Sequence, residues 1–257
     1  MPISRRAILR GFGATAVSLA AALPFSTAAA DSIESELSAL ENWTPGAVVS
    51  EKALRRFGLA RAFAAEPISE KIMKRMAGRS YKADCTVPRE ALRYIRIAHF
   101  NADGRIQLGE LVVAKAAAAD FQAVFKELFE ARYRIERMVL IDDYDADDER
   151  SMRANNTSAF NFRMVAGTKV LSNHSLGAAV DLNSLYNPYV KRRRDGTLYV
   201  SPEAGRPYAD RSKAFPYRLT ADDTAVRIFK KHGFTWGGDW KNLKDWQHFE
   251  KKLPAQP

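Results

Sequence analysis

The sequence is poor in residues that carry redox or covalent chemistry. Among its 257 residues there is a single cysteine, Cys85, and there are only four histidines. A lone cysteine cannot close an intramolecular disulfide, which excludes a disulfide-stapled fold. The chain has no internal repeat and, beyond its first 30 residues, no low-complexity segment. With 46% hydrophobic and 11% aromatic residues, it has enough apolar side chains for a packed core, so we expect a globular protein.

The chain also lacks a long hydrophobic run. Its longest apolar stretch, residues 11–23, is too short and too rich in small residues for a membrane span. A basic start with Arg5, Arg6 and Arg10 precedes this stretch, and small residues ending at Ala30 follow it, which is typical of a cleaved export signal. The letters SRRAIL resemble the twin-arginine motif. We therefore expect export to the periplasm or cell envelope and no stable membrane insertion afterwards; an N-terminal anchor helix is the alternative.

An excess of basic residues gives a net charge of +10. Loss of residues 1–30 removes three arginines and no acids, which leaves +7. The charges are scattered rather than gathered on one helix face, so nucleic acid is not an expected partner. One basic run, KRRRDG at residues 191–196, either attracts a substrate with carboxylates or is a solvated loop. The sequence does not indicate an oligomeric state.

Hydrophobic periodicity predicts a mixed α+β fold. Residues 31–80 are predicted to form a helical extension, followed by a main domain over residues 81–257. Residues 92–114 suggest two strands joined by a turn at Asp103-Gly104, and residues 116–133 have the spacing of an amphipathic helix. Adjacent strands favour a small antiparallel sheet with flanking helices over a doubly wound parallel sheet.

The second half of the chain has weaker periodicity. RMVLIDDY, residues 137–144, is predicted as a strand, and residues 184–217 are predicted as a long surface loop because they are rich in Tyr, Pro, Gly and Arg. A helix is expected within residues 220–234, capped by Thr220 or Asp222 and stopped at Gly233.

The segment SNHSLGAAVDLN places His174 seven residues before Asp181. Seven residues of straight strand span about 23 Å, so the two side chains can meet only if the chain turns between them, and Gly177 supplies the backbone freedom for a turn. AAVDLN then suggests a buried strand, in which the Asp181 carboxylate needs a cation or hydrogen-bond donors. A metal ion meets that need; backbone donors and a surface histidine are the alternative.

The segment DWQHFE carries a second pair, Asp245 and His248. A helical or tight turn would bring both side chains to one site, whereas a straight strand would place them on opposite faces. In such a turn His248 can bind a metal while Asp245 accepts a proton from the attacking water. An exposed charged turn is the alternative. His99 and His232 have no comparable partners and are not predicted to be ligands.

These two segments contain the motifs of a known family. SNHSLGAAVDLN matches Ser-x-His-x-x-Gly-x-Ala-x-Asp, and DWQHF matches the closing acid-x-x-His motif, of the D-alanyl-D-alanine carboxypeptidase (VanY-like) family of zinc peptidases. The chain resembles this family from about Pro67 to Glu250. The resemblance implies the α+β fold that this family shares with lysostaphin-type peptidases and hedgehog domains.

The resemblance also implies the site. It implies one Zn²⁺ held by His174, Asp181 and His248, with Asp245 as the base. An arginine upstream would stabilise the oxyanion, for which Arg163 is the first choice and Arg153 the second, and Ser172 would contact substrate. The implied activity is hydrolysis of peptidoglycan stem peptides, foremost as a D-alanyl-D-alanine carboxypeptidase. An L-alanyl-D-glutamate-type endopeptidase and a noncatalytic cell-wall-binding module are the alternatives.

Overall fold

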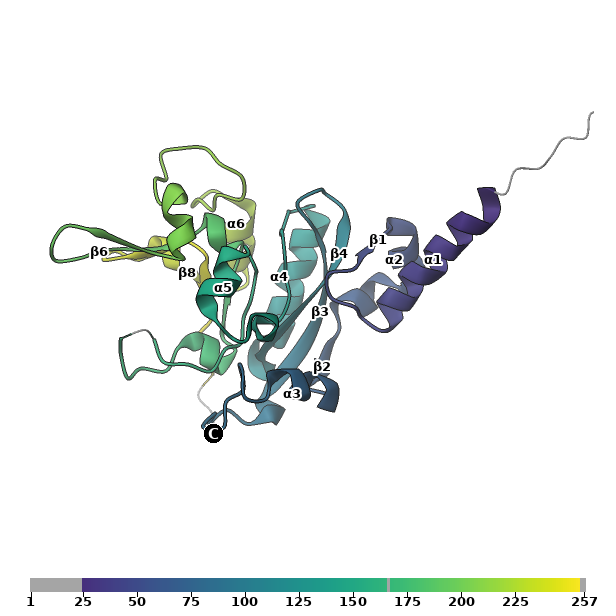
Figure 1. Cartoon of the computed structure of the whole chain (residues 1–257), viewed down its shortest axis with the longest axis horizontal. Coiled ribbons are helices and arrows are strands. Elements are labelled where there is room, and N and C mark those ends of the chain that lie inside the picture. The colour runs from purple at the N-terminus through teal and green to yellow at the C-terminus, as the bar shows by residue number, and fades with distance from the viewer. Residues whose placement is uncertain (1–24, 166, 255–257) are drawn as a thin grey trace, which may run out of the picture.

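The computed structural model describes residues 25–165 and 167–254 (Figure 1). The predicted export signal lies outside these residues, apart from its last few positions, where a helix begins at Phe25. No helix in the described part of the chain combines the length and the apolar character that crossing a membrane requires.

Helices and short antiparallel sheets alternate along the described residues, which confirms the predicted α+β class. The α-helices are α1 (Phe25–Glu41), α2 (Glu51–Phe57), α3 (Glu70–Met76), α4 (Ala118–Glu130), α5 (Asp148–Arg153) and α6 (Thr224–Lys231). The strands are β1 (Val48–Val49), β2 (Ala65–Pro67), β3 (Leu92–Phe100), β4 (Ile106–Ala114), β5 (Ala179–Asp181), β6 (Tyr189–Arg192), β7 (Leu198–Ser201), β8 (Thr235–Trp236), β9 (Lys244–Asp245) and β10 (His248–Glu250).

The largest sheet has the order β1-β4-β3-β2 and is antiparallel throughout. The predicted strand pair is confirmed: β3 and β4 pair over nine residues each around a turn in which Gly104 has a φ of 73°. The predicted helix is confirmed as α4, whose Phe121 and Phe125 are buried. Figure 1 shows α4 beside this sheet. Since β1 and β2 come from residues 31–80, the sheet crosses the predicted domain boundary, which stays a prediction.

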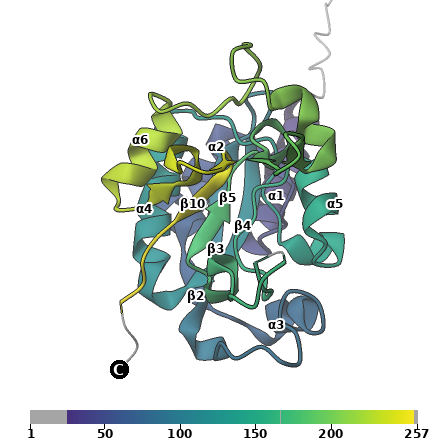
Figure 2. The same ribbon diagram turned by 90° about the vertical axis from the view of Figure 1, so that its left-hand side faces the viewer.

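Two three-stranded sheets build the half of the molecule that carries the C-terminal elements. Their orders are β5-β10-β8 and β7-β6-β9. Figure 2 shows β5 and β10 side by side in front of β3 and β4. The ring of Phe249 in β10 stacks on Phe229 in α6 with centroids 4.0 Å apart, so this sheet is fixed by the core beneath it. The cap of α6 is Asp223, one residue after the predicted Asp222, because its side chain accepts a hydrogen bond from Ala225 N.

The predicted strand at residues 137–144 is wrong. Beyond a single bridge at Arg137 the segment is irregular, and it ends in a 3₁₀ helix over Ile141–Tyr144. Apart from one bond from Glu110 N in β4 to Met138 O, side chains take its backbone N–H groups: Val139 N donates to Asn156 Oδ1, and Leu140 N donates to Glu110 Oε1. An apolar run therefore lies buried without joining a sheet.

The predicted long loop at residues 184–217 is also wrong in its first part. Residues 189–201 form a hairpin of β6 and β7, in which Tyr189 pairs with Ser201 and Arg192 with Leu198. Its turn contains Asp195-Gly196, and Gly196 has a φ of 83°. Because Asp-Gly is a strong hairpin turn, the sequence contained the signal for this structure.

Candidate metal centre

The first pair of candidate residues lies on a turn and the strand that follows it. His174 is in a 3₁₀ turn over Asn173–Leu176, and Gly177 ends the turn with a φ of 65°. Asp181 is the last residue of β5, whose other two residues are fully buried. The predicted turn and the predicted buried strand are thus both present, and they bring His174 Nε2 within 3.3 Å of Asp181 Oδ2.

Gly177 also fixes the turn to the large sheet. Its carbonyl accepts a hydrogen bond of 2.8 Å from Ala114 N at the end of β4. A Cβ atom at Gly177 would lie 2.4 Å from that same nitrogen. The glycine is therefore required twice, for its left-handed backbone and for this close approach. As a result, the turn that carries His174 is positioned by the most regular part of the fold.

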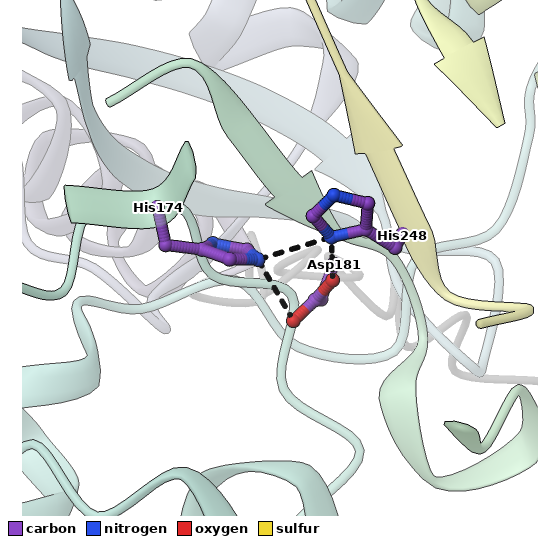
Figure 3. A group of neighbouring side chains, drawn as sticks. All are labelled: His174, Asp181 and His248. Atoms are coloured by element: carbon purple, nitrogen blue, oxygen red, sulfur yellow. Dashed lines mark hydrogen bonds and ion pairs between the residues drawn. The ribbon is translucent and has the colours of Figure 1, made fainter. Parts of the chain in front are cut away.

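The third candidate comes from the end of the chain. β10 pairs with β5 so that His248 lies directly opposite Asp181, and its Nδ1 is 3.1 Å from Asp181 Oδ1. The same Nδ1 is 3.1 Å from Nε2 of His174. Figure 3 shows these three side chains pointing toward one another. Within the residues that the structure describes, they are the one group of three whose ligand atoms all lie within 4.8 Å of one another.

The outer nitrogens of both histidines have acceptors. Nδ1 of His174 lies 2.7 Å from the carbonyl oxygen of Ala159, and Nε2 of His248 lies 3.0 Å from Glu250 Oε2. A neutral ring that donates from its outer nitrogen carries a lone pair on its inner one. Two ring lone pairs and one carboxylate then converge on a single point. Only a cation or extra protons can stabilise this arrangement.

The spacing fits a tetrahedral ion. Ligand bonds of about 2.0–2.1 Å in tetrahedral geometry place neighbouring ligand atoms roughly 3.3–3.4 Å apart. The two ring nitrogens are 3.1 Å apart, and each lies close to one oxygen of Asp181, at 3.1 Å from Oδ1 for His248 and at 3.3 Å from Oδ2 for His174. Three ligands from histidine and carboxylate leave one position of such an ion open, as in hydrolytic sites. The residues present therefore fit a metal ion; its identity is a matter for the proposal below.

The close contacts among these residues set the protonation states of His248 and Asp181 when no metal is bound. Burial alone would lower the pKa of His248, but hydrogen bonds to Asp181 and Glu250 outweigh it and raise that pKa to about 10. Burial would raise the pKa of Asp181, but the two histidines outweigh it and hold that pKa well below its usual range. Without a metal, His248 is therefore protonated and neutralises Asp181.

Asp245 lies beside this group at the end of β9. The chain turns at Trp246 and Gln247, between Asp245 and His248, which confirms the predicted tight turn. Among the described residues the buried Oδ1 of Asp245 has no hydrogen-bond partner, and a Cβ at Gly237 would lie 2.9 Å from its Cβ. Burial, together with the negative charge of Asp181, raises the pKa of Asp245 to about 6. A carboxyl with such a pKa, facing the site, is suited to acid–base work near neutral pH.

A cavity of about 1020 Å³ exposes the group to solvent. Its lining includes His174, Asp181, His248, Asp245, Ser172 and Arg163.

Arg163 forms an ion pair with Asp148, and its main chain is tied to the His174 turn through Ser175 Oγ. Arg153, in α5, is exposed and does not line the cavity. Ser172 caps the turn, since its Oγ accepts a hydrogen bond from His174 N. The structure thus brings the predicted site residues to one cavity; their roles stay predictions.

The two other histidines lie elsewhere. His99 is buried in β3 against Gly109, and burial lowers its pKa to about 4. His232 follows α6, where its Nε2 is 2.8 Å from Glu127. Neither lines the cavity.

Two residues of the site were missed in the sequence. Glu250 holds the outer nitrogen of His248 and accepts a 2.6 Å hydrogen bond from Asn173 Nδ2. The strand period could have revealed it, because residues i and i+2 share a face. Trp240, whose ring centroid lies 5.4 Å from that of His248, had no comparable signal.

Part of the chain matches a known protein family. Residues 166–251 match the family model described as D-alanyl-D-alanine carboxypeptidase. No curated protein and no solved structure gives a significant match. The matched segment contains all three candidate ligands and Asp245, and it leaves residues 67–165, where a likeness was also expected, unmatched. The match supports a peptidase, hence a hydrolase, with peptidoglycan peptides as its substrate class. The resemblance predicted from the two motifs is therefore confirmed, over residues 166–251, as similarity to the D-alanyl-D-alanine carboxypeptidase family.

Proposed function

We propose that the protein is a zinc-dependent D-alanyl-D-alanine carboxypeptidase of peptidoglycan stem peptides. The observation that carries the proposal is the convergence of two imidazole lone pairs and the Asp181 carboxylate beside an unpartnered Asp245 oxygen. Zinc is favoured because it accepts mixed nitrogen and oxygen ligands at this spacing. A noncatalytic binding module has no need of a second buried carboxyl at such a centre.

Each residue then has a defined task. Zinc, when bound, supplies Lewis acidity that polarises a carbonyl and makes water more acidic. Asp245 takes the proton from the water that attacks the scissile carbonyl and returns it to the leaving amine. The guanidinium of Arg163 faces the same cavity, where it stabilises the oxyanion, and Asp148 holds it in place. Ser172 caps the His174 turn and lines the same cavity, where it contacts the substrate.

The activity is tested on a muropeptide that ends in D-Ala-D-Ala. The zinc-loaded protein is expected to release one terminal D-Ala, detected by mass spectrometry of both products. Treatment with a chelator should abolish release, and zinc should restore it. Cleavage inside the stem instead would establish the endopeptidase alternative. Stoichiometric zinc without any hydrolysis would leave only a binding module.

We also propose that the chain is exported by the twin-arginine route, on the strength of the SRRAIL segment and the apolar stretch after it. Exchange of Arg5 and Arg6 for Lys is expected to leave full-length precursor in the cytoplasm. Cell fractionation and immunoblotting measure this. Unchanged export of the double variant would contradict the proposal.

A further inference from the structure

Four consecutive cationic residues, Lys191 to Arg194, lie on the β6–β7 hairpin, and all four line the cavity of the candidate metal centre. They are exposed, and within the described residues none of them forms an ion pair. The other arginine that lines the cavity, Arg163, is paired with Asp148. The uncompensated positive charge of the cavity is therefore concentrated on one element.

The hairpin is attached to the strand that carries Asp245. β6 pairs with β9, with Tyr189 opposite Asp245 and Val190 opposite Lys244. Figure 1 shows the hairpin projecting from the end of the molecule opposite α1. Because of this pairing, the positions of the cations are set relative to the reacting group by strand hydrogen bonds and not by a flexible linker.

Aromatic contacts order the cationic side chains further. The guanidinium of Arg193 lies 5.1 Å from the centroid of the Tyr199 ring, and Tyr199 packs edge-on against Tyr189. Arg192 Nη1 donates a hydrogen bond of 2.9 Å to Gly196 O. Ordered guanidinium groups lose less conformational entropy when they bind a carboxylate than a free surface lysine does.

Three acids of the cavity already have hydrogen-bond or ion-pair partners. Asp148 pairs with Arg163, Glu250 accepts from His248 and Asn173, and Glu149 Oε1 accepts from Glu203 N. Among the described residues, the cavity-lining cations without an ion-pair partner thus lie on the hairpin. A peptide bound across the cavity would contact the candidate metal centre and Asp245 at one end and the hairpin cations at the other.

We propose that the β6–β7 hairpin is an anion-binding arm that selects peptides with a carboxylate in addition to the groups at the scissile bond. This rests on the proposed function, because it names the substrate class of that same site. Lys191 and Arg192 follow Tyr189 by two and three residues, which is roughly 7–10 Å along a strand. An extended peptide advances by the same length per residue, so the recognised carboxylate lies about two or three residues from the scissile bond.

The proposal is tested with two stem peptides that differ only in charge, one with its side carboxylates free and one with them amidated. The zinc-loaded wild type is expected to prefer the acidic peptide by tenfold or more in kcat/KM, and this preference should decline with added salt. A hairpin variant with Lys191→Gln, Arg192→Gln and Arg193→Gln should hydrolyse both peptides with equal kcat/KM.

Two control variants test whether the preference for the acidic peptide depends on the hairpin cations or on the overall charge of the protein. A variant with Lys52→Gln, Arg55→Gln and Arg56→Gln in α2, at the other end of the molecule (Figure 1), removes the same charge and should keep the preference. A variant with Arg192→Lys, Arg193→Lys and Arg194→Lys retains charge and should keep most of it. An equal loss in the α2 and hairpin variants, or no preference in the wild type, overturns the proposal.

Direct binding distinguishes this proposal from the proposed activity. If the wild type hydrolyses neither peptide, equilibrium binding of both to the zinc-loaded protein still tests the hairpin. Tighter binding of the acidic peptide that is lost in the hairpin variant supports the anion-binding arm and refutes only the hydrolysis. Equal binding of both peptides refutes the arm.

Discussion

Replacement of Asp245 by Asn is expected to lower kcat by about 10²–10⁴-fold, the usual contribution of a general base, while the zinc content stays unchanged. Asn has the same shape but cannot accept a proton from water. The carboxyl is not one of the three converging ligands, and its buried Oδ1 has no partner whose loss would disturb the fold. Turnover is measured as D-Ala release, and zinc by elemental analysis of the purified variant.

A neighbouring carboxylate provides the control. Asp239 is exposed and pairs with Lys230 at 2.7 Å, outside the cavity lining. Asp239→Asn therefore removes the same charge from the same segment of chain and should retain near wild-type turnover. Full turnover in Asp245→Asn with zinc in place would remove Asp245 from the mechanism.

The acid side of the pH profile follows from the same group. A base works only when ionised, so kcat/KM falls as the pH drops through its pKa. Burial and the charge of Asp181 raise the pKa of Asp245 to about 6 in the metal-free protein. A cation at the three ligands offsets the charge of Asp181 and brings this pKa down, which places the acid limb at or below about pH 6. The Asp245→Asn variant should lack that limb; an identical limb in both proteins would assign it to another group.

The candidate site could be predicted from sequence because its chemistry is local. His174 and Asp181 are joined by a short turn that needs a glycine, and Asp245 and His248 by another turn, so spacing alone restricts their geometry. The pairing of the two segments is not local. The register that sets His248 opposite Asp181 depends on the core under β10, and only the match to a family motif indicated it in advance.

The two wrong predictions have different physical causes. An apolar run such as residues 137–144 satisfies a strand pattern, but tertiary contacts from Asn156 and Glu110 take its backbone groups instead. Polar composition suggested a loop at residues 184–217, although the Asp195-Gly196 turn and pairing with β9 make its first part a hairpin. Long-range partners overrode the local pattern in residues 137–144, whereas in residues 184–217 the local turn signal was missed.

Replacement of Asp181 by Asn is expected to weaken zinc binding by more than the roughly 10–100-fold that loss of a second partner of a metal-bound histidine costs. Asp181 is the one anionic member of the converging group, and its side chain is only 13% exposed. An amide offers a neutral oxygen in its place and does not offset the ion's charge. Competition with a chromophoric chelator measures the dissociation constant.

The Glu250→Gln variant provides a comparison for the loss of zinc affinity in Asp181→Asn, because Glu250 orients the ring of His248 but is not one of the three ligands. It should weaken zinc binding within that 10–100-fold range. Glu127→Gln removes a similar carboxylate from the His232 pair, 2.8 Å apart and outside the cavity lining, and should leave zinc affinity unchanged. Since a metal must displace the proton that the raised pKa keeps on His248, the affinity of the wild type should also increase with pH. Equal zinc affinity in wild type, Asp181→Asn and Glu250→Gln would show that the ion binds elsewhere.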